Sequence, residues 1–153
     1  MWKTLIYGLL ASALLSGAAY AESLGGLAGY WQGTGRVVLE SGHEQVKCTA
    51  TNKASANGAE LRMSWRCASG SFNIYVIGQL QVNGSVLSGT WEERTYNVSG
   101  TVSGRVSPEL VTAHITGGGF TGTITIETRG SVQRVVFTPR EGGVKGVTVT
   151  LHK

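Results

Sequence analysis

All nine acidic side chains of this 153-residue chain are glutamates. The absence of aspartate excludes an aspartate-based calcium loop, an aspartic dyad and a Ser-His-Asp triad. The three histidines, His43, His114 and His152, have no His, Cys or Glu partner at a metal-ligand spacing. No nucleophile elbow, phosphate loop or dinucleotide fingerprint occurs in a suitable context. We therefore expect no enzyme activity, no metal and no cofactor.

Glu92 and Glu93 are adjacent, but neighbouring residues of a strand point to opposite faces, so the two carboxylates cannot share one substrate. Glu93 has the same parity as Trp91 and should face inward, where a carboxylate needs a cation or solvent. The candidate cations by residue type are Arg94, Arg105 and Arg134. An ion pair at a barrel mouth is the simplest interpretation. The candidate ligand contacts at that mouth are Glu93, Tyr96 and Arg105.

The two cysteines, Cys48 and Cys67, flank an Asn57-Gly58 pair, which is typical of a two-residue hairpin turn. In that hairpin, opposed residue numbers sum to 115, so the cysteines lie directly opposite each other at a hydrogen-bonded position. Their Cα atoms should be about 5.5 Å apart or closer, which a disulfide can span. The cross-link should contribute about 3 kcal/mol to stability.

The same register gives this hairpin one apolar face and one cationic face. The cationic face carries Lys47, Lys53, Arg62 and Arg66, with only Glu60 as an acid. A solvated surface is the simplest interpretation, and contact with an anionic envelope component is the alternative. No run of five or six like charges suggests nucleic-acid binding.

These residues lie in a chain of short alternating segments separated by turns at roughly ten-residue spacing. The strands are predicted at 29–39, 44–53, 60–68, 71–82, 85–94, 98–106, 110–116, 120–128, 131–138 and 144–151. The short connections make neighbouring strands antiparallel. The pattern predicts an all-β, antiparallel meander β-barrel of eight to ten strands with one disulfide.

Glycines inside the predicted strands favour a narrow barrel over a β-sandwich, because sharp bends help to close a sheet. A second hairpin, turning at Asn83-Gly84, is expected to place Leu80 opposite Leu87 and Gly78 opposite Gly89. Patterning alone leaves open whether the interior is hollow or filled.

The N-terminus resembles a secretory signal peptide, with Lys3, an apolar stretch from Leu5 to Leu15, and a cleavage pattern at Ala19-Tyr20-Ala21. We expect a signal peptide over residues 1–21 and one domain over 22–153, in the periplasm or outside the cell. No later segment has the length of a membrane helix. The chain ends in Leu151-His152-Lys153, unlike most outer-membrane barrels, so we do not expect it to span a membrane.

Gly29-Tyr30-Trp31 resembles the Gly-x-Trp signature of calycin-type barrels, which include the lipocalins and, more loosely, the avidins. The resemblance implies a small ligand-binding barrel. It also implies that Trp31 packs at the closed barrel end against an arginine near the last strand, for which Arg140 or Arg134 would serve.

Leu27-Ala28-Gly29-Tyr30-Trp31 is similar to a string in bacterial periplasmic metalloproteinase inhibitors, which are single-disulfide barrels. That resemblance implies inhibition through the first mature residues, 22–26. Lys47-Cys48, the segment 61–68 and the segment 89–96 resemble small exported proteins of rhizobia and their relatives, which supports the compartment and the fold only.

Together these observations predict an exported, non-catalytic binding protein whose partner is a small ligand or an anionic envelope component. The alternative is a periplasmic proteinase inhibitor that acts through its N-terminal segment. Deleting residues 22–26 should separate the two, because only the inhibitor would lose its effect.

Overall fold

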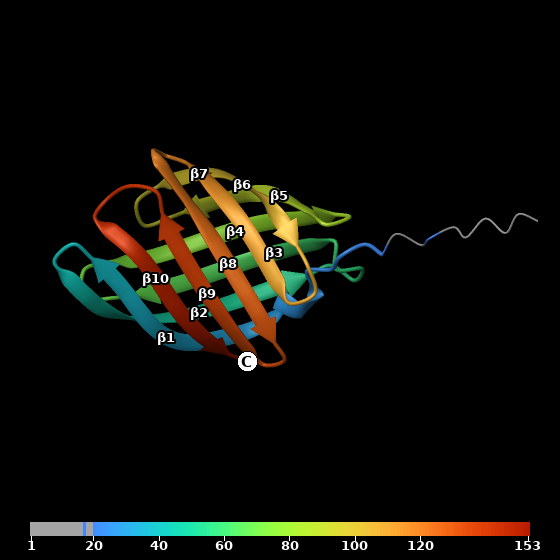
Figure 1. The fold of residues 1–153 in the computed structure, drawn as a ribbon, viewed down its shortest axis with the longest axis horizontal. Coiled ribbons are helices and arrows are strands. Elements are labelled where there is room, and N and C mark those ends of the chain that lie inside the picture. The colour runs from blue at the N-terminus through green and yellow to red at the C-terminus, as the bar shows by residue number, and fades with distance from the viewer. Residues whose placement is uncertain (1–16, 18–19) are drawn as a thin grey trace, which may run out of the picture.

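A computed structural model describes residue 17 and residues 20–153 of the chain. Most of the predicted signal peptide lies outside these residues, so its cleavage after Ala21 stays a prediction. The described chain forms one short 3-10 helix and ten strands (Figure 1). The elements are η1 (Gly25–Leu27), β1 (Gly29–Leu39), β2 (Gly42–Ala54), β3 (Glu60–Ala68), β4 (Asn73–Asn83), β5 (Val86–Glu93), β6 (Val98–Val106), β7 (Leu110–Gly117), β8 (Phe120–Arg129), β9 (Val132–Pro139) and β10 (Val144–His152).

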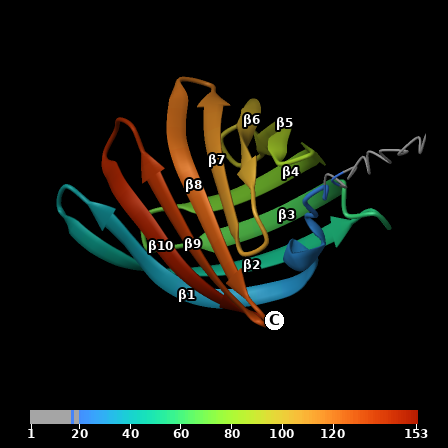
Figure 2. The same ribbon diagram turned by 45° about the vertical axis from the view of Figure 1, so that its right-hand side comes forward.

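The strands form a closed antiparallel barrel in which each strand pairs with the next and β1 pairs with β10. In Figure 1 the strands β7 to β10 cross over the strands β2 to β6, and Figure 2 shows the same crossing from the side. The short turns between consecutive strands leave the chain no other neighbour to pair with, so a meander results. The predicted all-β barrel with a single disulfide is confirmed.

The first hairpin has the predicted register, and Cys48 lies opposite Cys67 in a disulfide with a Cα–Cα distance of 4.1 Å. Its turn is longer than predicted, because the Ser55 amide already donates to the Glu60 carbonyl at 3.0 Å and residues 56–59 form the loop. Hydrogen-bonded and non-hydrogen-bonded pairs alternate along an antiparallel ladder. The cysteines, seven positions further along, therefore occupy a non-hydrogen-bonded pair, where the strands approach more closely, and the predicted hydrogen-bonded position was wrong.

The predicted register of the second hairpin was wrong by two residues. Asn83 lies opposite Val86, so Gly84 and Ser85 make the turn, and Gly84 has a positive φ of 62° that favours glycine there. Leu80 consequently lies opposite Gly89 instead of Leu87. The sum of opposed residue numbers changes by two, which preserves side-chain parity, so every inward residue stays inward.

Glycines allow the barrel to bend where strands approach closely. A Cβ added at Gly33 would lie 1.8 Å from the Thr150 carbonyl oxygen, and one at Gly100 would lie 1.7 Å from that of Thr116. No side chain fits at either position. The two sites lie on strands β1 and β6, at separate places around the wall, as expected for a sheet that closes on itself.

The two ends of the barrel differ. We call the end where β1 begins the closed end, because η1 lies there, and the opposite end, bounded by the turns after β1, β3, β5, β7 and β9, the open end. Among the described residues η1 is the only helical element, so hairpin turns alone border the open end. Near the closed end Trp31, Leu87 and Leu151 are fully buried, while Ala54 and Leu80 are partly buried. In the open half Val37 and Val46 are buried as well, whereas Leu39, Phe72 and Val98 keep part of their surface accessible.

Candidate functional site

The closed end is sealed by hydrogen bonds that meet at one carbonyl. The Leu27 carbonyl of η1 accepts from the Trp31 indole nitrogen and from the Asn52 amide nitrogen, each at 3.0 Å. The Asn52 side-chain oxygen in turn accepts from the Trp65 indole at 3.2 Å. Each of these buried polar groups therefore has a partner, as a dry barrel end requires.

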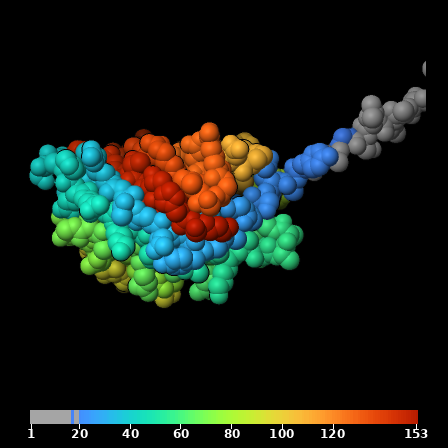
Figure 3. Space-filling view, turned by 90° about the horizontal axis from the view of Figure 1, so that it is seen from below, coloured from blue at the N-terminus to red at the C-terminus, as the bar shows by residue number. Residues whose placement is uncertain are grey.

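The residues before η1 are attached to the same end. The backbone amide of Glu22 donates to the Gly84 carbonyl at 3.0 Å, and that of Leu24 donates to the Gly58 carbonyl at 2.8 Å. The Leu24 side chain is completely buried. Figure 3 shows the blue N-terminal residues lying against the strands at this end. The segment 22–26, expected to act in the inhibitor hypothesis, therefore docks on the barrel.

A cation does lie over Trp31, but it is not Arg140. The Lys153 ammonium is 5.1 Å from the centre of the Trp31 ring. Arg140 follows β9, which runs from the closed end to the open end, and its backbone amide donates to the Thr121 carbonyl there. Arg134 faces outward, opposite Glu127. Neither predicted arginine therefore lies at Trp31, because Arg140 lies at the open end and Arg134 on the outer face.

An aromatic cluster lies at the open end. The ring centres of Trp91 and Phe120 are 6.1 Å apart, edge to face, and those of Phe120 and Phe137 are 5.3 Å apart in a stacked arrangement. The Trp91 indole donates to the Thr116 carbonyl at 3.3 Å. Phe120 remains 38% exposed although its parity is inward. We call Trp91, Phe120 and Phe137 the aromatic cluster.

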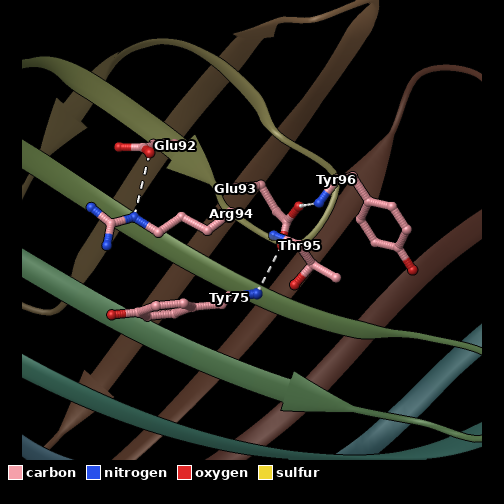
Figure 4. A network of polar contacts seen from close by, with 6 residues as sticks. All are labelled: Tyr75, Glu92, Glu93, Arg94, Thr95 and Tyr96. Carbon is pink, nitrogen blue, oxygen red and sulfur yellow. Dashed lines mark hydrogen bonds and ion pairs between the residues drawn. The ribbon is translucent and has the colours of Figure 1, made fainter.

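Glu93 ends β5 beside this cluster, with only 6% of its surface exposed (Figure 4). Its carboxylate accepts hydrogen bonds from the backbone amides of Tyr75 at 2.9 Å, Thr95 at 2.9 Å and Tyr96 at 2.6 Å. Burial acts to raise the pKa of Glu93, but these amides together hold the pKa below its ordinary value. The carboxylate is therefore ionised and fixes the turn after β5.

The expected ion pair of Glu93 is not formed. Among the described residues its partners are backbone amides, and Arg94 instead lies 3.3 Å from the carboxylate of Glu92. Tyr96 stands next to Glu93 with 58% of its surface exposed, its ring directed away from the carboxylate in Figure 4. Arg105 lies near the closed end on the outer face and donates to the Ser85 hydroxyl at 3.3 Å. The structure brings Glu93 and Tyr96 together and leaves Arg105 apart.

The predicted basic residues all face outward on β2 and β3. Lys53 lies directly opposite Arg62. The Arg66 guanidinium stacks on the Tyr75 ring at 3.6 Å, with Arg94 5.7 Å from the same ring centre. Lys47 lies opposite Ala68 at the other end of the hairpin ladder. The four cations therefore share one face, as the register predicted.

Residues 17 and 20–153 contain no cluster of three or more His, Cys, Asp or Glu side chains that could hold a metal ion. Within the same range, no helix has both the length and the apolar character needed to cross a membrane.

Phe120 and Phe137 were not among the predicted site residues. Their signal was parity, because Phe120 alternates in phase with the inward residues Gly122, Ile124 and Ile126. The stacking of Phe120 on Phe137 joins β8 to β9 in space and depends on the register between the two strands.

The fold is a closed ten-strand antiparallel meander barrel. Among solved structures the chain is similar to an S-type phycobiliprotein lyase from Guillardia theta, with a TM-score of 0.52 and 12% sequence identity over 84% of this chain and 86% of that chain. At this identity the similarity shows the fold alone. No family model and no curated protein matches the chain. The resemblances to rhizobial exported proteins and to proteinase inhibitors therefore stay predictions.

Proposed function

We propose that this protein is an exported, non-catalytic binding protein that takes a small, largely apolar ligand at the open end of its barrel. One observation carries the proposal, namely that Phe120 of the aromatic cluster and several inward-facing apolar side chains of the open half, such as Leu39, Phe72 and Val98, keep accessible surface. Ligand sites in proteins are typically concave and lined by apolar and aromatic side chains with a few fixed polar groups. The mouths of β-barrels are common places for them.

The neighbouring polar groups support binding more than catalysis. The Glu93 carboxylate already accepts three backbone hydrogen bonds, so it is held in one protonation state and has little capacity to move a proton. The structural neighbour is called a lyase, and a likeness in fold does not carry an activity across 12% identity. Export is supported by the disulfide, since such bonds persist in oxidising compartments.

Phe120 is the best residue with which to test the site, because it joins the cluster while remaining partly exposed. We expect the apolar dye N-phenyl-1-naphthylamine to bind with increased fluorescence. Phe120→Ser should raise the dissociation constant of the dye about tenfold, because burying a phenylalanine side chain contributes about 1.5–3 kcal/mol. The protein is prepared from periplasm, where its intact mass reports both processing after Ala21 and any retained ligand.

The matched control is Tyr30→Ser, which removes an aromatic side chain that is 53% exposed at the closed end. This variant should bind the dye as the unmodified protein does. Equal weakening by both substitutions, or no dye binding to the unmodified protein, would contradict a site at the open end.

A further inference from the structure

A groove of about 530 Å³ lies on strands β2 to β5 near the closed end, lined by outward-facing polar side chains and by Ala54, Leu61, Leu80 and Gly89. Its exposed polar lining comprises Lys53, Glu60, Arg62, Gln79, Gln81 and Thr90, and the partly buried Ser55 also lines it. All six side chains are exposed, and they belong to neighbouring strands of one continuous sheet. Apart from Ser55 in the turn after β2, the groove is therefore built on ladder positions of the sheet.

Two neighbouring cations in the groove destabilise the sheet. Lys53 lies directly opposite Arg62, and like charges in that position repel. No salt bridge in the described part of the chain includes either residue. Two adjacent cations without an acidic partner on the protein form a favourable position for an anion.

Hydrogen-bonding side chains continue the same row. Arg62 lies opposite Gln79, and Gln79 lies opposite Thr90, so the row from Lys53 to Thr90 crosses four strands. Three strand spacings give the row a length of about 14 Å. An amide and a hydroxyl at this spacing suit a chain of hydroxyl groups better than a single ion.

We propose that this groove binds an acidic oligosaccharide. A sugar carboxylate lies between Lys53 and Arg62, whose guanidinium can donate two parallel hydrogen bonds to it. The hydroxyl groups of the following sugars bond to Gln79, Gln81 and Thr90. Glu60 lies beside Gln81 and repels negative charge, so the acidic group is directed towards Lys53 and Arg62. The polar, hollowed surface does not suit a flat bilayer.

The groove lies near the closed end, whereas the proposed apolar ligand enters the open end of the interior, so the two proposals stand or fall separately. Phe120→Ser should leave the affinity of the groove unchanged. Failure of the unmodified protein to bind the dye would contradict the open-end proposal alone, and its failure to bind the saccharide would contradict the groove proposal alone.

The test is calorimetric titration of the folded protein with tetragalacturonate at low salt, with its methyl-esterified, neutral form as the comparison. We expect the acidic form to bind and the neutral form to bind at least tenfold more weakly. Replacing both cations, Lys53→Gln with Arg62→Gln, should weaken binding of the acidic form tenfold or more. Added salt should weaken it as well, because the cations are exposed.

The matched control removes the same charge elsewhere, with Arg36→Gln and Arg134→Gln on the outer faces of β1 and β9. Both arginines are exposed, so this variant should change the affinity twofold at most. Equal loss in the two double variants would show general attraction to polyanions and overturn the site. So would failure of tetragalacturonate to bind. Competition by inorganic sulfate at equal concentration would show an isolated anion site and overturn the oligosaccharide assignment.

Discussion

The two ends of this barrel use similar side chains for different purposes. At the closed end, Trp31 is completely buried, and its indole nitrogen shares the Leu27 carbonyl with Asn52. At the open end, Trp91 and Phe120 make an edge-to-face contact, but Phe120 remains 38% exposed. Trp31, which η1 covers, acts as core, whereas at the open end Trp91 is buried and Phe120, bordered only by turns, remains available for contact.

Polar groups show the same contrast. Asn52 links η1 to Trp65 and so fixes the lid of the closed end. Glu93 holds three amides of the surrounding backbone and so shapes the rim of the open end. Each of these two buried side chains orders the chain segment beside it. The closed end should therefore respond to substitution mainly in stability, and the open end mainly in binding.

The largest expected effect is that of Trp31→Ala at the closed end. Truncating a fully buried tryptophan leaves a cavity and removes one donor from the Leu27 carbonyl, so the free energy of unfolding should fall by about 3–5 kcal/mol. Urea unfolding monitored by circular dichroism measures it. Tyr30→Ala, at the exposed neighbouring position, should change it by less than about 1 kcal/mol. A loss as small as that of the control would mean that the closed end is not the principal core.

The second prediction concerns Glu93 at the open end. Glu93→Gln replaces a charged acceptor of three amide hydrogen bonds with a weaker neutral one, so the free energy of unfolding at neutral pH should fall by about 1–3 kcal/mol. The folded state lowers the pKa of Glu93 below its ordinary 4.5. Its contribution is therefore complete above that pH and is lost as the pH falls through the lower folded value.

Unfolding curves of the unmodified protein and of Glu93→Gln should accordingly converge in acid. Glu92→Gln provides the control, because the Glu92 side chain is 51% exposed in its contact with Arg94 and should contribute less than about 1 kcal/mol. A stability difference that persists unchanged well below pH 4.5 would show that the carboxylate charge is not what holds the turn.

The fold was predictable because alternation and turn residues repeat along the whole chain. Strands 29–39, 60–68 and 98–106 have the predicted bounds, and the cysteine register is the predicted one. The error in the second hairpin arose because Asn83-Gly84 and Gly84-Ser85 are both acceptable turn pairs, and only Gly84 requires a positive φ. Parity survived that error, so the inward face could still be derived.

The site was less predictable, because it depends on which end of the barrel each residue occupies. Glu93 and Tyr96 are three positions apart on one turn, so the chain itself keeps them together. Arg105 lies twelve positions after Glu93, which carries it along β6 to the opposite end. The three amides that hold Glu93 come from a turn and from β4. Because backbone amides belong to every residue type, the sequence does not indicate which of them donate to Glu93.

Two side chains of the closed half, Gln133 and Thr128, carry buried polar groups without hydrogen-bond partners among the described residues. Gln133 is completely buried, and neither its amide nitrogen nor its amide oxygen has a hydrogen-bond partner among the described residues. Thr128, directly opposite on β8, has an unpaired buried hydroxyl. A buried amide without partners costs about 1–3 kcal/mol.

Gln133→Met should therefore raise the free energy of unfolding by about 1 kcal/mol, because methionine has a similar length and no amide to desolvate. Gln32→Met, on the exposed face of β1, should change it by less than about 0.5 kcal/mol. Denaturant titration of both variants measures the difference. If Gln133→Met destabilises the protein instead, the carboxamide is hydrogen-bonded in solution and contributes to the stability of the closed half.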